Sequence, residues 1–167
     1  MKIETGYVPG VIGSIAEMHA RYYSRTSGFG AEFESKVAAG LADFVSRLER
    51  PCNQIWHVSE NGRVQASIAV DGEDLGKNFA HLRWFLIDDN LRGHGLGNKM
   101  MRKSLQFCDD RSFDKVILWT FEGLDAARSL YEKNGFQLVE EWQGDQWGTV
   151  VSEQRFERDR AEVRSRT

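Results

Sequence analysis

The stretch DDNLRGHGLGNKMM, Asp88 to Met101, places an arginine ahead of three alternating glycines, Gly93, Gly95 and Gly97. The preceding run FAHLRWFLID is typical of a buried strand, and a helix is predicted to begin near Gly95. The first amides of a helix lack intrahelical partners and lie at the positive end of its dipole, and glycine lets a ligand approach the backbone closely. With Arg92 adding charge, this corner predicts a phosphate-binding cradle. A turn that needs glycine only for its own conformation is the alternative.

Two common nucleotide motifs do not fit this corner. No run in the chain matches the P-loop pattern G-x-x-x-x-G-K-[ST]. The dinucleotide pattern G-x-G-x-x-G fails on its last position, which falls on Asn98 when the motif starts at Gly93 and on Met100 when it starts at Gly95. A different phosphate-containing ligand is therefore expected.

The rest of the chain is expected to alternate between helices and strands. Apolar residues recur at helical spacing in residues 12–23 and 33–48, and Pro51 is expected to end the second helix. Asn61-Gly62 predicts a hairpin between two short apolar runs. Further strands are predicted at 79–87, 115–121, 136–142 and 148–158, and helices at 95–110 and 124–135. This order predicts an α/β (or α+β) fold with a mixed sheet.

Composition limits the class of protein. The 167 residues are 41% hydrophobic, enough for one core, and the net charge of -3 argues against a nucleic-acid partner held by bulk electrostatics. No segment is apolar enough to predict a signal peptide or a membrane span. Cys52 and Cys108 are too few for a disulfide scaffold and lack metal-ligand spacing. We therefore expect a cytoplasmic protein without a nucleic-acid, membrane or metal partner.

Two motifs carry a family resemblance. Arg92 to Gly97 (RGHGLG) resembles the R/Q-x-x-G-x-G/A pyrophosphate loop of the GNAT superfamily of N-acetyltransferases. Ala126 to Phe136 (AARSLYEKNGF) resembles the family's A-x-x-L-Y-E-K-x-G-F segment. The resemblance covers roughly residues 3–157 and implies the GNAT fold, in one domain over 1–157: a mixed, mostly antiparallel sheet of about six to seven strands flanked by about four helices. Residues 158–167 are expected to form a charged, frayed tail. More narrowly, the chain is similar to the acetyltransferase part of MarR-type regulator fusions, without their DNA-binding part.

The resemblance implies acetyl-CoA as co-substrate, with its pyrophosphate in the glycine corner and its pantetheine in a gap between strands 79–87 and 115–121. The residues implied to bind it are Phe85, Leu86, Ile87, Arg92, Gly93, His94, Gly95, Leu96, Gly97, Asn98 and Arg128. One departure concerns the asparagine that many family members carry after the fifth strand. Here that segment reads TFEGL, Thr120 to Leu124, so the contacts to the cofactor are expected to differ.

Attack of a neutral amine on a thioester needs a base for the amine and an acid for the leaving thiolate. Tyr131 matches the family's motif tyrosine, which implies the role of acid; packing of its helix is the alternative. Strand alternation predicts that His81 shares a face with Arg83, Phe85 and Ile87. The position of His81 resembles that of the catalytic glutamate or histidine of related enzymes, which makes it the candidate base. A solvent-exposed histidine, with a water chain as base, is the alternative.

The resemblance implies that the acceptor is an amine, and the overall acidity of the chain favours a cationic one. The candidate substrate-binding residues are Tyr22, Tyr23, Glu122 and Trp142. His19, His57 and His94 form no predicted metal site. A small-molecule amine is the leading expectation; a protein lysine or N-terminus, or a non-catalytic acyl-CoA sensor, are the alternatives. By analogy with the family, a homodimer is also allowed.

Overall fold

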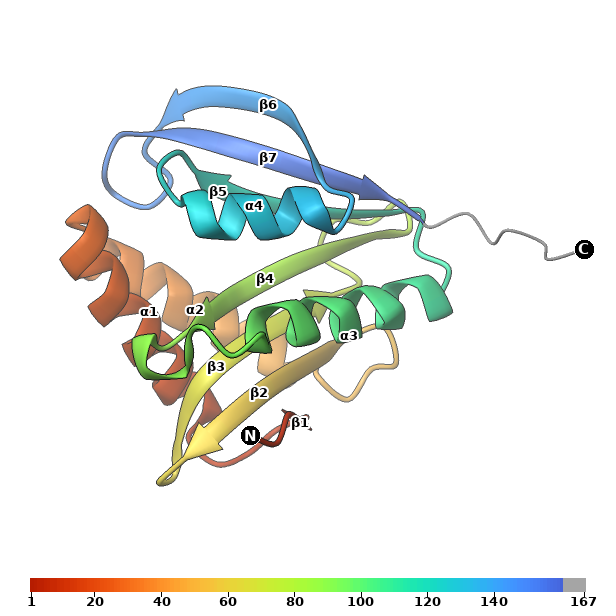
Figure 1. Cartoon of the computed structure of the whole chain (residues 1–167), viewed down its shortest axis with the longest axis horizontal. Coiled ribbons are helices and arrows are strands. Elements are labelled where there is room, and N and C mark those ends of the chain that lie inside the picture. The colour runs from red at the N-terminus through yellow and green to blue at the C-terminus, as the bar shows by residue number, and fades with distance from the viewer. Residues whose placement is uncertain (161–167) are drawn as a thin grey trace, which may run out of the picture.

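The computed structural model describes residues 1–160, which form an open sheet of seven strands covered by helices on both faces (Figure 1). The strands are β1 (Glu4–Thr5), β2 (Gln54–Glu60), β3 (Arg63–Asp71), β4 (Phe79–Ile87), β5 (Lys115–Phe121), β6 (Gln137–Gly144) and β7 (Val151–Asp159). The helices are α1 (Val11–Ser27), α2 (Ala31–Ser46), α3 (Leu96–Asp110) and α4 (Asp125–Lys133), with a short 3-10 turn, η1 (Asp89–Leu91). The sheet order is β1-β2-β3-β4-β5-β7-β6, and the expected mixed, mostly antiparallel architecture is confirmed.

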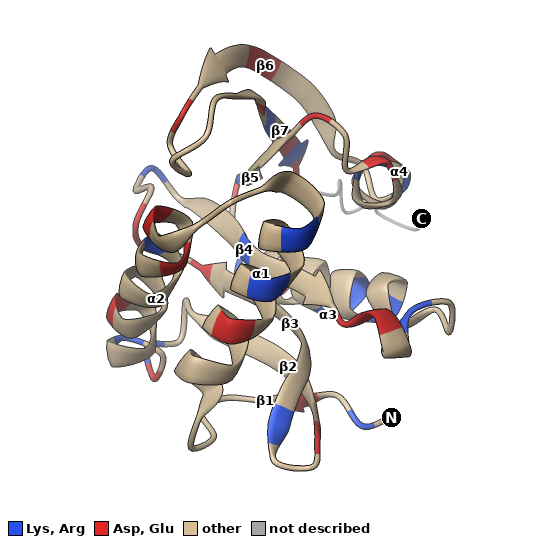
Figure 2. Ribbon diagram, turned by 90° about the vertical axis from the view of Figure 1, so that its left-hand side faces the viewer, with Lys and Arg blue, Asp and Glu red and all other residues tan. Residues whose placement is uncertain are grey.

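Each face of the sheet has its own apolar core. In Figure 1 helices α3 and α4 cross in front of the strands, and α1 and α2 lie on the opposite side. Consecutive strand residues point to opposite faces. Ile55 therefore packs with α1 and α2, whereas its neighbour Trp56 packs against Phe107 of α3. Helices α1 and α2 both carry acidic and basic residues (Figure 2).

The only parallel strand pair of the described chain joins β4 to β5, and it is short. Phe79 to His81 pair with Lys115 to Ile117, after which no further β4–β5 pairs form along the two strands. The strands β5, β7 and β6 continue as one antiparallel group beyond that point. The sheet is thus split between β4 and β5 toward their carboxyl ends, where α3 and α4 also begin.

A β-bulge at Trp84 corrects the predicted alternation of β4. The register with β3 shifts between Ser67 and Ala69, and Trp84 has a left-handed φ of 49°, which is uncommon for a bulky residue. The Ser67 hydroxyl donates a 2.7 Å hydrogen bond to the Trp84 carbonyl. Trp84 therefore packs toward α2, whereas Phe85 packs toward α3. The prediction that His81 and Phe85 share a face is wrong, because the bulge inserts one residue between them.

Other details of the elements also differ from the sequence prediction. Helix α2 ends at Ser46. Turns then lead the chain to Pro51, held by hydrogen bonds between residues three apart, such as that from the Leu48 amide to the Val45 carbonyl. Neither the two-residue strand β1 nor the turn η1 was predicted, since both are too short to show a period. Strand β7 runs to Asp159, two residues into the predicted tail, and 161–167 lie outside the described residues.

Candidate functional site

Two cavities meet at the split in the sheet. One, of about 480 Å³, is a groove over the glycine corner, between the start of α3 and the start of α4. The other, of about 210 Å³, lies between β4 and β5 and is covered by α1, α2 and the loop after β6. Tyr23, Phe85 and Tyr131 line both cavities. The two spaces therefore adjoin at these three rings.

The glycine corner has the shape of an anion cradle. Gly93 and Gly95 have φ values of 84° and 74°, a region that favours glycine, and a Cβ on either would project into open space. The first hydrogen bond of α3 runs from the Lys99 amide to the Gly95 carbonyl at 3.2 Å. The helix amides before Lys99 therefore have no partner within the helix and can bind a ligand. Gly97 serves a different purpose, because a Cβ there would lie 3.2 Å from Ile87. These residues fit a pyrophosphate approaching the backbone of the helix start.

Arg92 stands at the edge of this groove and is fixed by three contacts. Its Nε donates a 2.9 Å hydrogen bond to the Ile87 carbonyl and lies 3.6 Å from an Asp89 oxygen. Its guanidinium carbon lies 4.8 Å from the centre of the Tyr22 ring. Arg92 lines the groove, where a phosphate would gain from its charge.

Most, but not all, of the predicted cofactor residues line the groove. Those that do are Phe85, Leu86, Ile87, Arg92, Gly93, Gly95, Leu96 and Gly97. His94 and Asn98 do not, and the Asn98 side chain instead lies 3.5 Å from that of Asn134. Arg128 is turned to the other side of α4, where its Nε donates to Glu132 at 2.7 Å. The structure therefore does not bring Arg128 to the groove, because helix periodicity points it away.

His81 lines the second cavity and is oriented by a carboxylate. Its Nδ1 lies 2.7 Å from an Asp74 oxygen, and its ring meets the Trp119 ring edge-on at 4.9 Å between centres. Burial lowers the pKa of His81, although the hydrogen bond and charge of Asp74 oppose that change. A neutral His81 that donates from Nδ1 to Asp74 keeps Nε2 as a proton acceptor. This is the arrangement that a general base requires.

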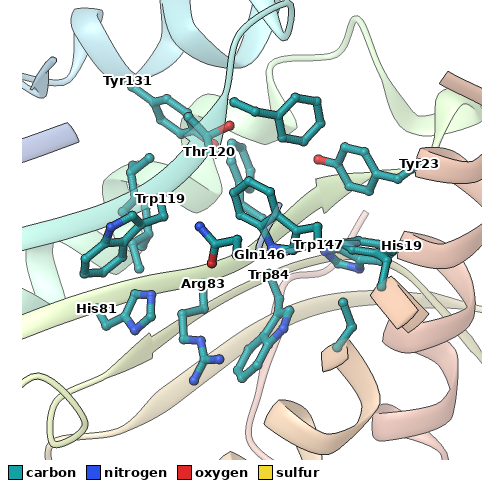
Figure 3. A pocket seen from close by; sticks show the side chains of 16 residues that line it. His19, Tyr23, His81, Arg83, Trp84, Trp119, Thr120, Tyr131, Gln146 and Trp147 are labelled. Atoms are coloured by element: carbon teal, nitrogen blue, oxygen red, sulfur yellow. The ribbon is translucent and has the colours of Figure 1, made fainter. Parts of the chain in front are cut away.

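Tyr131 lies at the junction of the two cavities. It is 7% exposed, and burial raises its pKa above the ordinary value, so that the phenol stays protonated at neutral pH. Figure 3 places Tyr131 and Tyr23 on opposite sides of the second cavity, with the Tyr23 hydroxyl directed inward. Burial raises the pKa of Tyr23 as well. The junction therefore carries two neutral hydroxyl groups able to donate hydrogen bonds.

Two titratable residues of the second cavity, His19 and Arg83, were not predicted as site residues. His19 Nδ1 lies 2.8 Å from the Ile15 carbonyl, and burial lowers the pKa of His19 to about 4. Its position on the apolar face of α1 was the available signal, because a buried histidine on such a face needs a polar partner. Arg83 lies beside His81 at the lower edge of the cavity (Figure 3). The contact of Arg83 with Trp84 depends on the β-bulge, which the sequence did not reveal.

The predicted substrate residues are distributed differently from expectation. Tyr23 lines both cavities, and Tyr22 lines the groove at the glycine corner but not the space between the strands. Glu122 is exposed and lies in a separate small pocket with Arg128. Trp142 lies on the outer strand β6 and lines neither cavity. The loop after β6 contributes Trp147 in its place.

Within residues 1–160, no three histidine, cysteine or acidic side chains are grouped as metal ligands would be. None of the helices over the same residues combines the length and apolar character needed to cross a membrane.

Comparison with known proteins bears on this arrangement. Residues 14–136 match the model of the acetyltransferase (GNAT) family. The chain is 30% identical over 120 residues to N-acetylaspartate synthetase of Xenopus tropicalis, covering 71% of this chain and 44% of that protein. It is 21% identical over 154 residues to human N-acetyltransferase 8B, covering 89% of this chain and 67% of that protein. The chain thus spans less than half the length of the first of these relatives.

Solved structures share the fold. A phosphinothricin acetyltransferase from Sinorhizobium meliloti, solved in complex with AcCoA, superposes with a TM-score of 0.73 at 16% identity, covering 100% of this chain and 93% of that one. The ribosomal-protein-alanine N-acetyltransferase of Brucella melitensis superposes with a TM-score of 0.74 at 12% identity, covering 95% and 99%. At such identities these similarities concern the fold alone.

Proposed function

Because the chain belongs to the acetyltransferase (GNAT) family, we propose that it is an N-acetyltransferase that moves an acetyl group from acetyl-CoA to the primary amine of a small molecule. One observation carries the proposal: the phosphate cradle and the cavity between β4 and β5 meet at Tyr131. A cofactor held by its pyrophosphate at the start of α3 would have its thioester end directed into that junction. Acetyl-CoA would supply the acetyl group as a thioester.

The roles of the side chains follow from their surroundings. His81, held by Asp74, would remove a proton from the incoming amine through Nε2, directly or through one water. Tyr131 would donate a hydrogen bond or proton to the departing sulfur, since burial keeps its phenol neutral. Tyr23 lies across the cavity and adds a second hydroxyl donor. The amides at the start of α3 and Arg92 would bind the pyrophosphate.

The cover of the second cavity favours a small acceptor over a protein chain. The loop after β6 is fixed to its surroundings, because Lys36 of α2 donates to the Gln146 carbonyl and Glu153 of β7 accepts from the Gln146 side chain. Trp147 from this loop packs on Phe121, with ring centres 5.6 Å apart. An extended peptide would need an open groove here. The names of the curated relatives also include an enzyme of a small amino acid, N-acetylaspartate synthetase.

The narrower resemblance to MarR-type fusions stays a prediction of the sequence.

Two alternatives to a small-molecule acceptor are a protein acceptor and a non-catalytic acyl-CoA sensor, and one experiment separates them. Titration calorimetry with acetyl-CoA, and with NADH and ATP as controls, tests the cradle. Release of free thiol in the presence of small amines, or of peptides with lysine and free N-termini, tests the transfer. Binding of acetyl-CoA with thiol release by small amines supports the proposal. Thiol release only with peptides favours a protein acceptor, and binding without thiol release favours a sensor.

A further inference from the structure

The acceptor cavity carries one permanently charged side chain within the described residues, and that charge is positive. Arg83 is the arginine that lines it, and no lysine, aspartate or glutamate of residues 1–160 does so. Its other titratable walls are histidines and tyrosines, among them His19 and His81. The cavity therefore offers a cation and several hydrogen-bond donors, but no carboxylate that would bind a cationic group.

Arg83 keeps free donors although two carboxylates are near it. Its Nη1 lies 3.8 Å from Asp71 and 3.7 Å from Asp74, distances too long for hydrogen bonds. Asp71 is already bound on both oxygens by Arg47, at 2.7 and 3.1 Å. Asp74 is committed to His81 at 2.7 Å. The side chain of Arg83 lines the cavity and is 25% exposed, so its neighbours do not close it off from a ligand.

The guanidinium of Arg83 is held in one place rather than left free. Its central carbon lies 4.1 Å from the centre of the Trp84 ring, and the bulge that turns Trp84 toward α2 creates this stack. Gly40 of α2 leaves just enough room for it, because a Cβ there would lie 3.1 Å from both Arg83 Nη2 and Trp84 Cζ2. A stacked, planar fork of this kind is well suited to a carboxylate.

We propose that the acceptor is a primary amine that also bears a carboxylate, an amino acid in the broad sense, and that Arg83 binds that carboxylate. The inference rests on the proposed function. One Asp74 oxygen is shared between His81 and Arg83, so the base and the cation lie at the same end of the cavity. An amine separated from a carboxylate by a short carbon chain would reach both. The aromatic walls formed by Trp84, Trp119 and Trp147 would contact the remainder of such a molecule.

This inference reverses the expectation drawn from the overall charge. A net charge of -3 favoured a cationic acceptor, but that charge is distributed over the whole surface. Within a cavity of about 210 Å³ the nearest charges decide, because low-dielectric walls reduce the screening that solvent provides. Four carboxylates lie near its edge: Asp43, Asp71 and Glu73 bind Arg47, and Asp74 binds His81. None of the four lines the cavity, so Arg83 is the charged side chain among its described walls.

The test compares matched amines on the wild type and on Arg83→Gln, Arg83→Lys and the control Arg63→Gln. Arg63 is an exposed arginine at the β2–β3 hairpin. Each amino acid is paired with its amide and its decarboxylated amine, and transfer is followed as thiol release from acetyl-CoA. The same amino acids are titrated calorimetrically into the protein saturated with CoA, which measures binding without any reaction.

We expect the wild type and Arg63→Gln to prefer the carboxylate-bearing member of a pair by about 10- to 100-fold in kcat/KM, the range for a hydrogen-bonded ion pair. Arg83→Gln should bring the ratio close to one and Arg83→Lys should restore it in part, with acetyl-CoA affinity unchanged in both. Equal rates for the two members in the wild type, or an unchanged ratio in Arg83→Gln, would overturn the inference. Thiol release by no amine at all, with amino-acid binding that depends on Arg83, would overturn the proposed function alone. If thiol release and Arg83-dependent binding both fail, both proposals fall.

Discussion

His81 Nδ1 lies 2.7 Å from an oxygen of Asp74, at the edge of the cavity between β4 and β5. A carboxylate only accepts hydrogen bonds, so it selects the tautomer of His81 in which Nδ1 carries the proton and Nε2 is free. Burial favours the neutral imidazole, and Asp74 favours the protonated one. The same Asp74 oxygen lies 3.7 Å from Arg83, so this one carboxylate places its negative charge beside both groups.

The first prediction concerns the pH dependence of transfer. His81→Ala should lower kcat/KM by about 100-fold or more, the range for loss of a general base, and should remove the low-pH limb of the rate profile. Because burial lowers the pKa of His81, the wild-type limb should lie below the ordinary histidine value. Asp74→Asn removes the group that raises this pKa, so its limb should move to still lower pH. A profile of kcat/KM between pH 4.5 and 9 measures all three, and a limb that persists in His81→Ala would identify another base.

The second prediction concerns the leaving group. Tyr131→Phe should lower kcat by about 10- to 100-fold while acetyl-CoA affinity stays close to that of the wild type. Since burial raises the pKa of Tyr131, ionisation of this phenol should not limit the rate up to pH 9. Single-turnover rates and calorimetric affinities are the measurements, with Tyr7→Phe, an exposed tyrosine, as control. Equal rates in the two variants would mean that Tyr131 only packs α4 against the sheet.

The third prediction separates strain from ligand contact at the glycine corner. Gly95 and Gly62 have nearly the same φ, 74° and 75°, and a Cβ on either meets open space. Valine at either position should therefore cost a similar amount of stability, about 1–2 kcal/mol. Only Gly95→Val should lose acetyl-CoA binding, because its side chain would enter the phosphate space. Thermal unfolding and calorimetry compare the two, and intact binding by a folded Gly95→Val would remove the cradle from the mechanism.

The fourth prediction uses a buried histidine. Burial lowers the pKa of His19 to about 4, from an ordinary value near 6.5. Between these two values the unfolded chain binds a proton that the folded chain does not, so stability falls as the pH drops through this window. The loss attributable to His19 is at most about 3 kcal/mol. Urea unfolding at pH 7 and 4.5 should show a smaller loss in His19→Gln than in the wild type, and equal losses would contradict the burial argument.

The fifth prediction tests the bulge. Ser67 and Ser104 are both fully buried, and each donates a 2.7 Å hydrogen bond to a carbonyl, of Trp84 and Met101 respectively. Replacement of either serine by alanine should lower the free energy of unfolding by about 1–3 kcal/mol. Only Ser67→Ala should also lower acetyl transfer, because it loosens the bulge beside Arg83. Denaturation and steady-state kinetics on the two variants decide this, and equal activities would limit Ser67 to a structural role.

Much of the fold follows from local patterns. Strands β4 and β5 were predicted with their observed bounds, and α3 was predicted to start at Gly95, next to its observed first residue. These elements have strong periods and clear boundary residues. The end of α2 was misplaced by several residues, because Pro51 marks the end of the following turns rather than of the helix.

The candidate site was predictable only in part. The positive φ of Gly93 and Gly95 at the start of α3 agrees with the predicted cradle, and its ligand stays a prediction. Arg128 was implied by the family resemblance and Glu122 was a candidate from its place at the end of a strand, but both lie in a separate small pocket. Arg83 was seen as a strand residue and not as a cavity residue, because its role depends on what faces it.

The sequence by itself determined the order of helices and strands, the glycine cradle and the motif tyrosine, because periodicity, backbone freedom and short motifs are local properties of a chain. Only the tertiary structure decided where β4 and β5 separate, how the bulge at Trp84 divides the side chains between the two faces, and which charges remain in the acceptor cavity. These depend on contacts between residues far apart in sequence. Arg47 neutralises Asp71 from another element, and that pairing leaves Arg83 available to a ligand.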